Sequence, residues 1–216
     1  MREEYTVVYE GGEGEIEEKK SRFIAHVRPV HSEEEAAAFV AEMKKKYWDA
    51  RHNCYAFIIG ADSEIARSSD DGEPSGTAGK PILEVLMGES LTDTAIVVTR
   101  YFGGTLLGTG GLIRAYTQAA KEGLAGSIIM TKRRGIRLSM TMDYMQEGKA
   151  RYLLAERGYA LLDPEYSDTV TLTTVVPVSE VDNVIKEITE KLNGRAECRK
   201  VEEVIYAVAG EKLIIC

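Results

Sequence analysis

Cysteine and proline are scarce in this chain. Its 216 residues include three cysteines and five prolines. The cysteines lie far apart and form neither a CxxC pair nor a cluster with histidine, so we expect no disulfide framework and no metal site of the zinc type. This use of cysteine is typical of a reducing compartment, and we expect a cytoplasmic protein.

Long apolar runs are also missing. No stretch approaches the roughly 18 consecutive apolar residues that a membrane-spanning helix needs. The first 18 residues are rich in glutamate and lack the basic start and apolar run of a secretory signal. Hydrophobic residues make up 44% of the chain and charged residues 29%, which is typical of a soluble globular protein without a membrane partner.

Basic residues are outnumbered, and the net charge is −8. Such a balance opposes tight non-specific binding to nucleic acid. One region differs, because no Asp or Glu occurs between Thr94 and Lys121, where Arg100 and Arg114 are present. If the chain binds an anion, this region is the place where we expect it.

The first half of the chain predicts an α+β domain. Ser32 is placed to cap a helix, with Glu35 completing a capping box, and Pro81 fits the first turn of a second helix. β-Branched and apolar runs predict the strands between them. We expect strands at 7–9, 22–30, 54–60 and 92–99, and a third helix at 112–124.

The pattern restarts after Thr131–Gly135, which is the best candidate for a linker. We expect strands at 136–141, 159–162, 169–177 and 204–208. Helices are expected between Asp143, as a cap, and Gly158, and again from Ser179 to Asn193. The order β-α-β-β-α-β is that of a ferredoxin-like domain. We therefore expect two domains, 1–131 and 136–216.

A glycine-rich loop is the densest candidate for a binding site. It follows a predicted strand, precedes a predicted helix, and contains five glycines in nine residues. Its bare N–H groups and the helix N-terminus can bind a phosphate or another anion, while the aromatic side chains can stack on a nucleobase. The alternative is a tight turn that packs its glycines against a neighbouring strand. The candidate binding residues are Arg100, Tyr101, Phe102, Gly103, Gly104, Gly108, Gly110, Gly111 and Arg114, with Lys80 from a neighbouring segment.

A polar segment from Ser68 to Pro81 carries the three carboxylates of Asp70, Asp71 and Glu73. These groups can do proton or cation chemistry, but the spacing of a calcium loop is absent. The alternative, which the residue types favour, is turn chemistry in which the side chains bond the local backbone. We therefore expect no metal and no cofactor.

His52 is the histidine that lies nearest other candidate groups. It can act as a general base or can order the backbone as a structural histidine. The second role is the more common one, so His52, Asp70, Asp71 and Glu73 are weak catalytic candidates. Cys54 enters an apolar run and is expected to be a buried small side chain rather than a nucleophile.

Four motifs in order give this chain a resemblance to a known family. They are residues 20–25 (KSRFIA), 52–56 (HNCYA), 70–79 (DDGEPSGTAG) and 100–104 (RYFGG). Together they resemble the IMPACT family, and most closely its bacterial YigZ/YvyE branch. The resemblance is specific over residues 1–130, and the second half also fits that branch.

The resemblance implies a fold and a setting. The N-terminal domain would be a βαβ domain similar to domain IV of elongation factor G, and the C-terminal domain would be similar to its domain V. The eukaryotic relative regulates translation by competing for a ribosome-associated activator of a stress-response kinase. What carries over is the general expectation of translation regulation, with the ribosome, RNA or a protein of translation as the partner.

Three functions follow as hypotheses. The first, which we favour, is a translation regulator that binds RNA or the ribosome through the glycine-rich loop. The second is an enzyme acting on a phosphorylated or other anionic small molecule; no nucleophile–base pair or set of metal ligands stands out for it. The third is a protein–protein adaptor, which predicts motif side chains that are buried and bonded internally.

Overall fold

The computed structural model describes residues 3–209 and 212–216. It separates into two compact units, Met1–Met130 and Thr131–Cys216. Each unit has helices and strands and its own apolar core, so the fold class is α+β. Among the described residues, no helix is both long enough and apolar enough to cross a membrane.

The first unit is built on a five-stranded antiparallel sheet with the order β2-β3-β7-β4-β5. Strand β7 lies at its centre, with β3 and β4 on either side. A further strand, β1 (Glu4–Glu10), pairs in parallel with the short β6 (Leu91–Thr92). The sheet strands are β2 (Glu13–Glu18), β3 (Ser21–Pro29), β4 (His52–Ile59), β5 (Ile65–Ser69) and β7 (Thr94–Tyr101).

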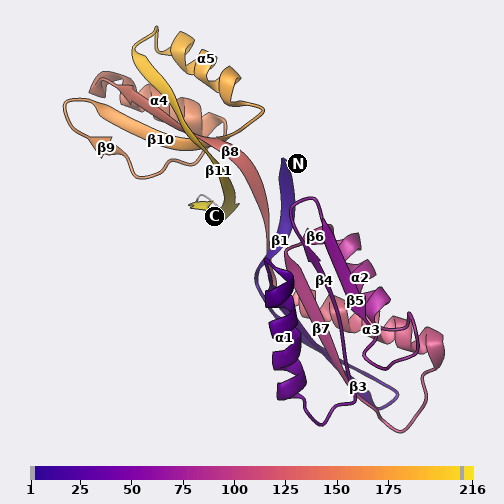
Figure 1. Ribbon diagram of the computed structural model, residues 1–216. Coiled ribbons are helices and arrows are strands. Elements are labelled where there is room, and N and C mark those ends of the chain that lie inside the picture. The colour runs from indigo at the N-terminus through magenta and orange to yellow at the C-terminus, as the bar shows by residue number, and fades with distance from the viewer. Residues whose placement is uncertain (1–2, 210–211) are drawn as a thin grey trace. The chain divides into compact units, whose positions relative to one another are not determined.

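Helices cover both faces of this sheet (Figure 1). Helix α1 (Glu33–Lys46) packs on one face, where Val97 of β7 is buried. Helices α2 (Gly79–Gly88) and α3 (Gly108–Ala125) pack on the other, where Val98 is buried. Successive strand residues point to opposite faces, so a strand covered on both sides is a continuous apolar run. This explains why the apolar run within 92–99 predicts a central strand, although β7 begins only at Thr94 and Thr92 belongs to β6.

Helix α1 begins as the sequence predicts. The Ser32 hydroxyl accepts a hydrogen bond from the Glu35 N–H at 3.1 Å. The Glu35 carboxylate in turn accepts from the N–H of His31, one residue before the cap, at 2.7 Å. The N–H of Glu35, which the helix itself leaves unpaired, and the N–H of His31 before the cap are thus both satisfied by side chains.

The segment Thr131–Gly135 is not an irregular linker. It lies inside one long strand, β8 (Ile128–Met142). Its glycine serves close packing, because a Cβ at Gly135 would lie 2.6 Å from Val175 and 2.7 Å from Tyr206. A glycine in a strand can mark such a close approach as well as a turn.

The second unit has the strand order of a ferredoxin-like fold. Strand β8 lies between β10 (Val170–Pro177) and β11 (Ala196–Ala209), antiparallel to both. Helices α4 (Tyr144–Glu156) and α5 (Val181–Lys191) pack on the sheet through one core. The second strand of the ferredoxin-like pattern is reduced to one bridge, Leu161 to Thr174.

Several element boundaries differ from the prediction. Residues 159–162 form no strand beyond that bridge, and β11 begins eight residues before the expected 204. Asp143 caps α4 by position without a side-chain hydrogen bond, and α5 begins after Glu180 rather than at Ser179. Four strands were not predicted: β2, β5, β9 (Glu165–Tyr166) and β12 (Lys212–Ile215).

The cap of α1 gives a stability prediction. Replacing Ser32 by Ala removes the acceptor for the Glu35 N–H and should lower the free energy of unfolding by about 1 kcal/mol. Ser32→Asp, which keeps an acceptor, is the matched control and should retain most of the stability. Urea unfolding followed by circular dichroism measures both. Equal loss in the two variants would contradict a capping role.

Candidate functional site

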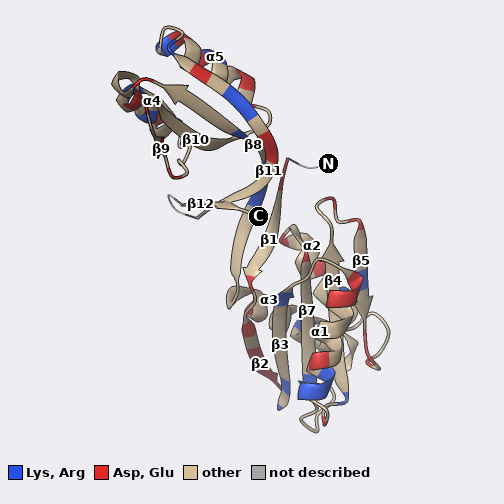
Figure 2. Ribbon diagram, turned by 60° about the vertical axis from the view of Figure 1, so that its left-hand side comes forward, with Lys and Arg blue, Asp and Glu red and all other residues tan. Residues whose placement is uncertain are grey.

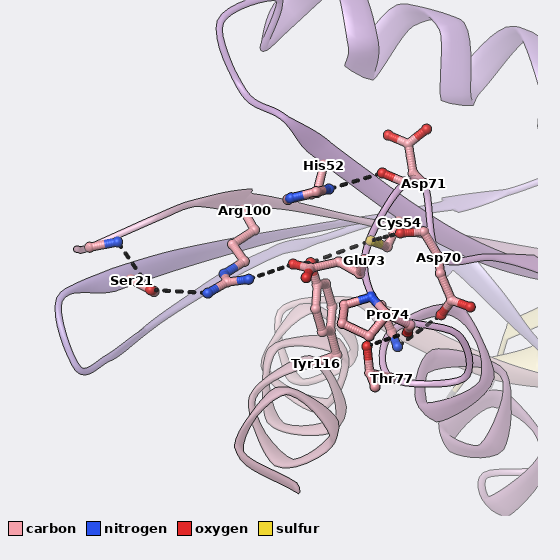
Figure 3. Close-up of polar contacts among 12 residues, drawn as sticks. Ser21, His52, Cys54, Asp70, Asp71, Glu73, Pro74, Thr77, Arg100 and Tyr116 are labelled. Atoms are coloured by element: carbon pink, nitrogen blue, oxygen red, sulfur yellow. Dashed lines mark hydrogen bonds and ion pairs between the residues drawn. The ribbon is translucent and has the colours of Figure 1, made fainter. Parts of the chain in front are cut away.

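The four motifs converge at one end of the first unit's sheet. Strands β3 and β4 begin there, at Ser21 and His52, while β5 and β7 end there, at Ser69 and Tyr101. The antiparallel register brings these ends together: Arg100 of β7 lies opposite His52 of β4. Segments distant in sequence therefore form one cluster (Figure 3).

A buried ion pair lies at the centre of the cluster. Arg100 Nη1 donates to Glu73 Oε1 at 2.7 Å, and the two side chains are 7% and 3% exposed. The hydroxyl of Tyr116, from α3, donates to the same carboxylate oxygen at 2.8 Å. Phe23 and Phe102 lie with their ring centroids 5.4 and 5.6 Å from the guanidinium. Arg100 was expected to bind an external anion, but its charge is paired with Glu73 inside the protein.

Cys54 belongs to the same network. Its thiol donates to the Asp70 carbonyl at 3.0 Å and lies 3.3 Å from the Tyr116 hydroxyl. Burial raises the pKa of the Cys54 thiol, and it also raises the pKa of the Tyr116 hydroxyl. Both groups therefore stay protonated at neutral pH, and Cys54 is a buried side chain, as expected, rather than a thiolate.

Asp70 organises the loop that leads into α2. One carboxylate oxygen accepts from the N–H groups of Ala78 and Gly79, at 3.0 and 2.8 Å, and the other from Gly76 at 2.8 Å. Ala78, at the cap position of α2, has no side-chain acceptor of its own. Asp70 supplies one from eight residues upstream, with its negative charge at the positive end of the helix dipole.

These contacts set the acidity of Asp70. Burial acts to raise its pKa, but the three N–H donors favour the carboxylate more strongly, and the pKa is lowered from its ordinary value. The carboxylate is committed to the loop. For Asp70 the turn-chemistry interpretation of the sequence describes what the structure shows.

Asp71 and His52 also form bonds within the protein. One Asp71 carboxylate oxygen accepts from the Asn53 N–H at 2.7 Å, and the other from the Lys44 ammonium at 2.6 Å. His52 Nδ1 lies 3.0 Å from the carbonyl oxygen of Asp71. His52 is thus placed to order backbone, and no His/Cys/Asp/Glu group arranged for a metal occurs among residues 3–209 and 212–216.

The glycine-rich loop has a packed base and an open tip. A Cβ at Gly103 would lie 2.0 Å from the Lys20 carbonyl carbon, and the Gly103 N–H donates to the Ser21 hydroxyl at 3.1 Å. Gly104 and Gly108 have positive φ, +84° and +69°, with open space where a side chain would be. The close-packing interpretation therefore describes Gly103, while the tip is free.

The N-terminus of α3 follows this tip. Gly108, Gly110 and Gly111 lie in its first turn, the cap residue Leu107 makes no side-chain cap bond, and no acidic residue lies in the first turn. The N–H groups of this turn therefore keep their attraction for an anion.

The remaining candidates separate into exposed and engaged side chains. Phe102 is 54% exposed, and Arg114 is exposed on α3. Tyr101 points the other way, with its hydroxyl donating to Asp49 at 2.7 Å. Lys80 lies on α2, where its ammonium is 3.9 Å from Glu84.

Sequence reasoning missed three contributors to the cluster. In the sequence, Tyr116 occupies what looks like an ordinary buried position on a helix face. Only the fold shows that its hydroxyl donates a hydrogen bond to Glu73. Ser21 bonds Arg100 and Gly103, and Asn53 accepts from Thr99 at 2.7 Å. Ser21 and Asn53 lie inside the family motifs, which is the signal that could have found them.

Comparison with known proteins defines the class of this two-unit α+β chain. A family model described as "Impact N-terminal domain" matches residues 19–124, and "Domain of unknown function (DUF1949)" matches residues 140–195. A solved structure described as "Crystal structure of an hypothetical protein" is 33% identical, with a TM-score of 0.60, over 94% of this chain and 99% of that one.

Named relatives narrow the class. "IMPACT family member YvyE" of Bacillus subtilis is 44% identical over 94% of this chain and 93% of its own length. "IMPACT family member YigZ" of Escherichia coli is 35% identical over 86% of this chain and 92% of its own length. The chain belongs to the IMPACT family, in its bacterial YigZ/YvyE branch.

The buried pair gives a first prediction for the site. Glu73→Gln and Arg100→Met should each lower the free energy of unfolding by about 3–5 kcal/mol, because each leaves a buried charge without its partner. The double variant should lose less than the sum of the two. Glu84→Gln, in the exposed pair with Lys80, is the control and should cost at most about 1 kcal/mol. Strictly additive losses at Glu73 and Arg100 would contradict the pairing.

Asp70 gives a pH prediction. The pKa of Asp70 is lower in the folded chain than in the unfolded one. Its contribution to the free energy of unfolding is therefore complete above the unfolded pKa, and it is lost as the pH falls through the folded pKa. The free energy of unfolding of the wild type should therefore fall on acidification below about pH 5. That of the Asp70→Asn variant should fall less steeply over the same pH range. Urea titrations between neutral and acidic pH measure the difference. Parallel curves would contradict this role.

Proposed function

We propose that this protein binds RNA, free or on the ribosome, through the tip of the glycine-rich loop. The observation that supports it is the exposure of an aromatic ring beside cations and uncapped N–H groups. Phe102 presents a ring for base stacking, Lys20 is exposed on the turn that packs against Gly103, and Arg114 is exposed on α3 with its guanidinium near Gly110. Aromatic side chains beside a cationic track are the common means of binding single-stranded nucleic acid.

The contacts at the loop base explain how the ring is held. The Gly103 N–H bonds Ser21, and the Arg100 guanidinium lies against the Phe102 ring. A ring fixed in this way loses little conformational freedom when a base stacks on it, which favours binding. In this proposal the buried Arg100 holds the Phe102 ring in place from the protein side and does not contact the RNA.

Lys20 reaches the tip through the turn that joins β2 to β3. Its backbone passes directly against Gly103, so its exposed side chain lies beside the loop. Leu106 is 83% exposed at the same tip and adds an apolar contact for a base or sugar. Phosphates would then be bound by Lys20, by Arg114 and by the N–H groups of the first turn of α3.

Acidic side chains limit the extent of the surface. Strand β2 carries Glu17 and Glu18, and together with α3 it lines a groove of about 490 Å³ that also includes Arg114. Figure 2 shows the acidic colouring along β2. These carboxylates share the groove with Arg114, so their repulsion opposes the attraction of its guanidinium for phosphate and keeps the affinity modest.

The carboxylates that the enzyme hypothesis would use for catalysis are already hydrogen-bonded within the protein. Asp70 accepts three N–H groups, and Glu73 is buried against Arg100 and Tyr116. A carboxylate held in this way is a poor general base for an outside substrate. Binding at the loop tip remains the function with the better chemical support.

Fluorescence anisotropy with a labelled single-stranded RNA tests the proposal. The Phe102→Ala/Arg114→Ala variant should bind at least about tenfold more weakly, since one stacked base contributes about 1–3 kcal/mol. Wild-type affinity should also fall as salt rises. Tyr152→Ala/Lys149→Ala, which removes an exposed ring and a cation from α4, is the matched control and should bind normally.

Sedimentation with purified ribosomes, run in the same salt series, repeats the comparison on the larger partner. Retained binding by the Phe102/Arg114 variant, or equal loss by the control, would reject the loop tip as the site.

A further inference from the structure

A groove of about 610 Å³ runs along the first unit, away from the glycine-rich loop, between α1 and strand β5. Its floor is aromatic: the rings of Tyr55 and Phe57 lie parallel, with centroids 6.2 Å apart and an interplanar angle of 5°. Its wall on the α1 side is made of small side chains, including Ala37 and Ala41. The volume suits several apolar side chains of a ligand.

The opposite wall is a sheet edge. Among the strands in the described part of the chain, β5 pairs only with β4 and ends the sheet order. Arg67 and Ser68 of β5 line the groove. The outer side of such a strand offers backbone N–H and C=O groups to another strand, and peptides use edges of this kind by adding a strand.

The two ends of the groove carry opposite charge. Glu33 and Glu34 lie at the start of α1, and Lys44 lies in its last turn. Figure 2 shows α1 in front of the sheet, with acidic colouring at one end and basic colouring at the other. The ten residue steps of helix from Glu34 to Lys44 span about 15 Å, and the six steps of a seven-residue extended segment span about 20 Å. The long side chains of Lys44 and Glu34 make up the difference at the two ends.

The direction of β5 is fixed by its contacts. Arg67 approaches Glu33, at 3.7 Å, near the start of α1. Ser69 ends the strand just before Asp71, which bonds Lys44 near the end of α1. Strand β5 therefore runs from the acidic end of the groove to the basic end. An antiparallel partner, the more stable pairing, runs from the basic end to the acidic end.

We propose that this groove binds a short extended segment of a partner protein, which adds to β5 as an antiparallel strand. The segment has seven residues, of which the first, third, fifth and seventh face α1 and the aromatic floor: an acidic residue at Lys44, two apolar residues over Tyr55 and Phe57, and a basic residue at Glu34. The alternation follows from the period of two along a strand, which turns every second side chain toward the aromatic floor. The proposal is independent of RNA binding at the loop tip.

Peptide display against the full-length chain tests this inference. A library of random nine-residue peptides is selected on the wild type and counter-selected on Ala41→Phe, whose ring fills the groove from an exposed position. Enriched peptides should share the order acidic, any, apolar, any, apolar, any, basic. Their affinity, measured by fluorescence anisotropy, should fall at least tenfold on Ala41→Phe.

Ala38→Phe is the matched control, because Ala38 is exposed on α1 and does not line the groove. It should bind the selected peptides as the wild type does. The Glu34→Lys variant reverses the charge at the acidic end and leaves the Lys44–Asp71 pair intact, and it should select peptides whose last residue is acidic rather than basic. The proposal is overturned if no peptide prefers the wild type over Ala41→Phe, or if the peptides selected on Glu34→Lys keep a basic last residue.

Discussion

The buried ion pair between Glu73 and Arg100 is the interaction on which the binding end of the first unit depends. Arg100 is the last residue but one of the central strand, and Glu73 comes from the loop that leads into α2. Tyr116 ties the same carboxylate to α3. Taking two charges out of water is costly, and the cost is offset only when both keep good partners. The pair therefore enforces one arrangement of strand, loop and helix.

This constraint separates two roles among the family motifs. Their polar side chains mostly turn inward, where Asp70 holds a loop and Arg100 holds Glu73. The inward direction is what the adaptor hypothesis required of them. The large side chains that reach solvent at the loop tip, Phe102 and Leu106, are apolar. The motifs thus build a rigid base, and the proposed RNA-binding surface is the small exposed part that this base presents.

Much of the fold was predictable because its signals are local. The Ser32 cap and the buried run of β7 depend on neighbours in the sequence. The edge strand β5 was missed because its residues read as a polar loop, and its pairing with β4 is a tertiary effect. At the site, the glycine loop was located correctly from sequence, but the burial of Arg100 was not. Its partner Glu73 lies 27 residues away, and a charge pattern does not show which ions meet.

The most direct test of this account is native-state hydrogen exchange on Glu73→Gln compared with the wild type. We expect the amides of residues 70–79 and of residues 101–108 to exchange faster together, because one pair anchors both segments. The centres of β3 and β7 should stay protected, since their ladders do not depend on that carboxylate. Faster exchange confined to residues 70–79, with an unchanged glycine-rich loop, would contradict the claim that the ion pair holds the binding end together.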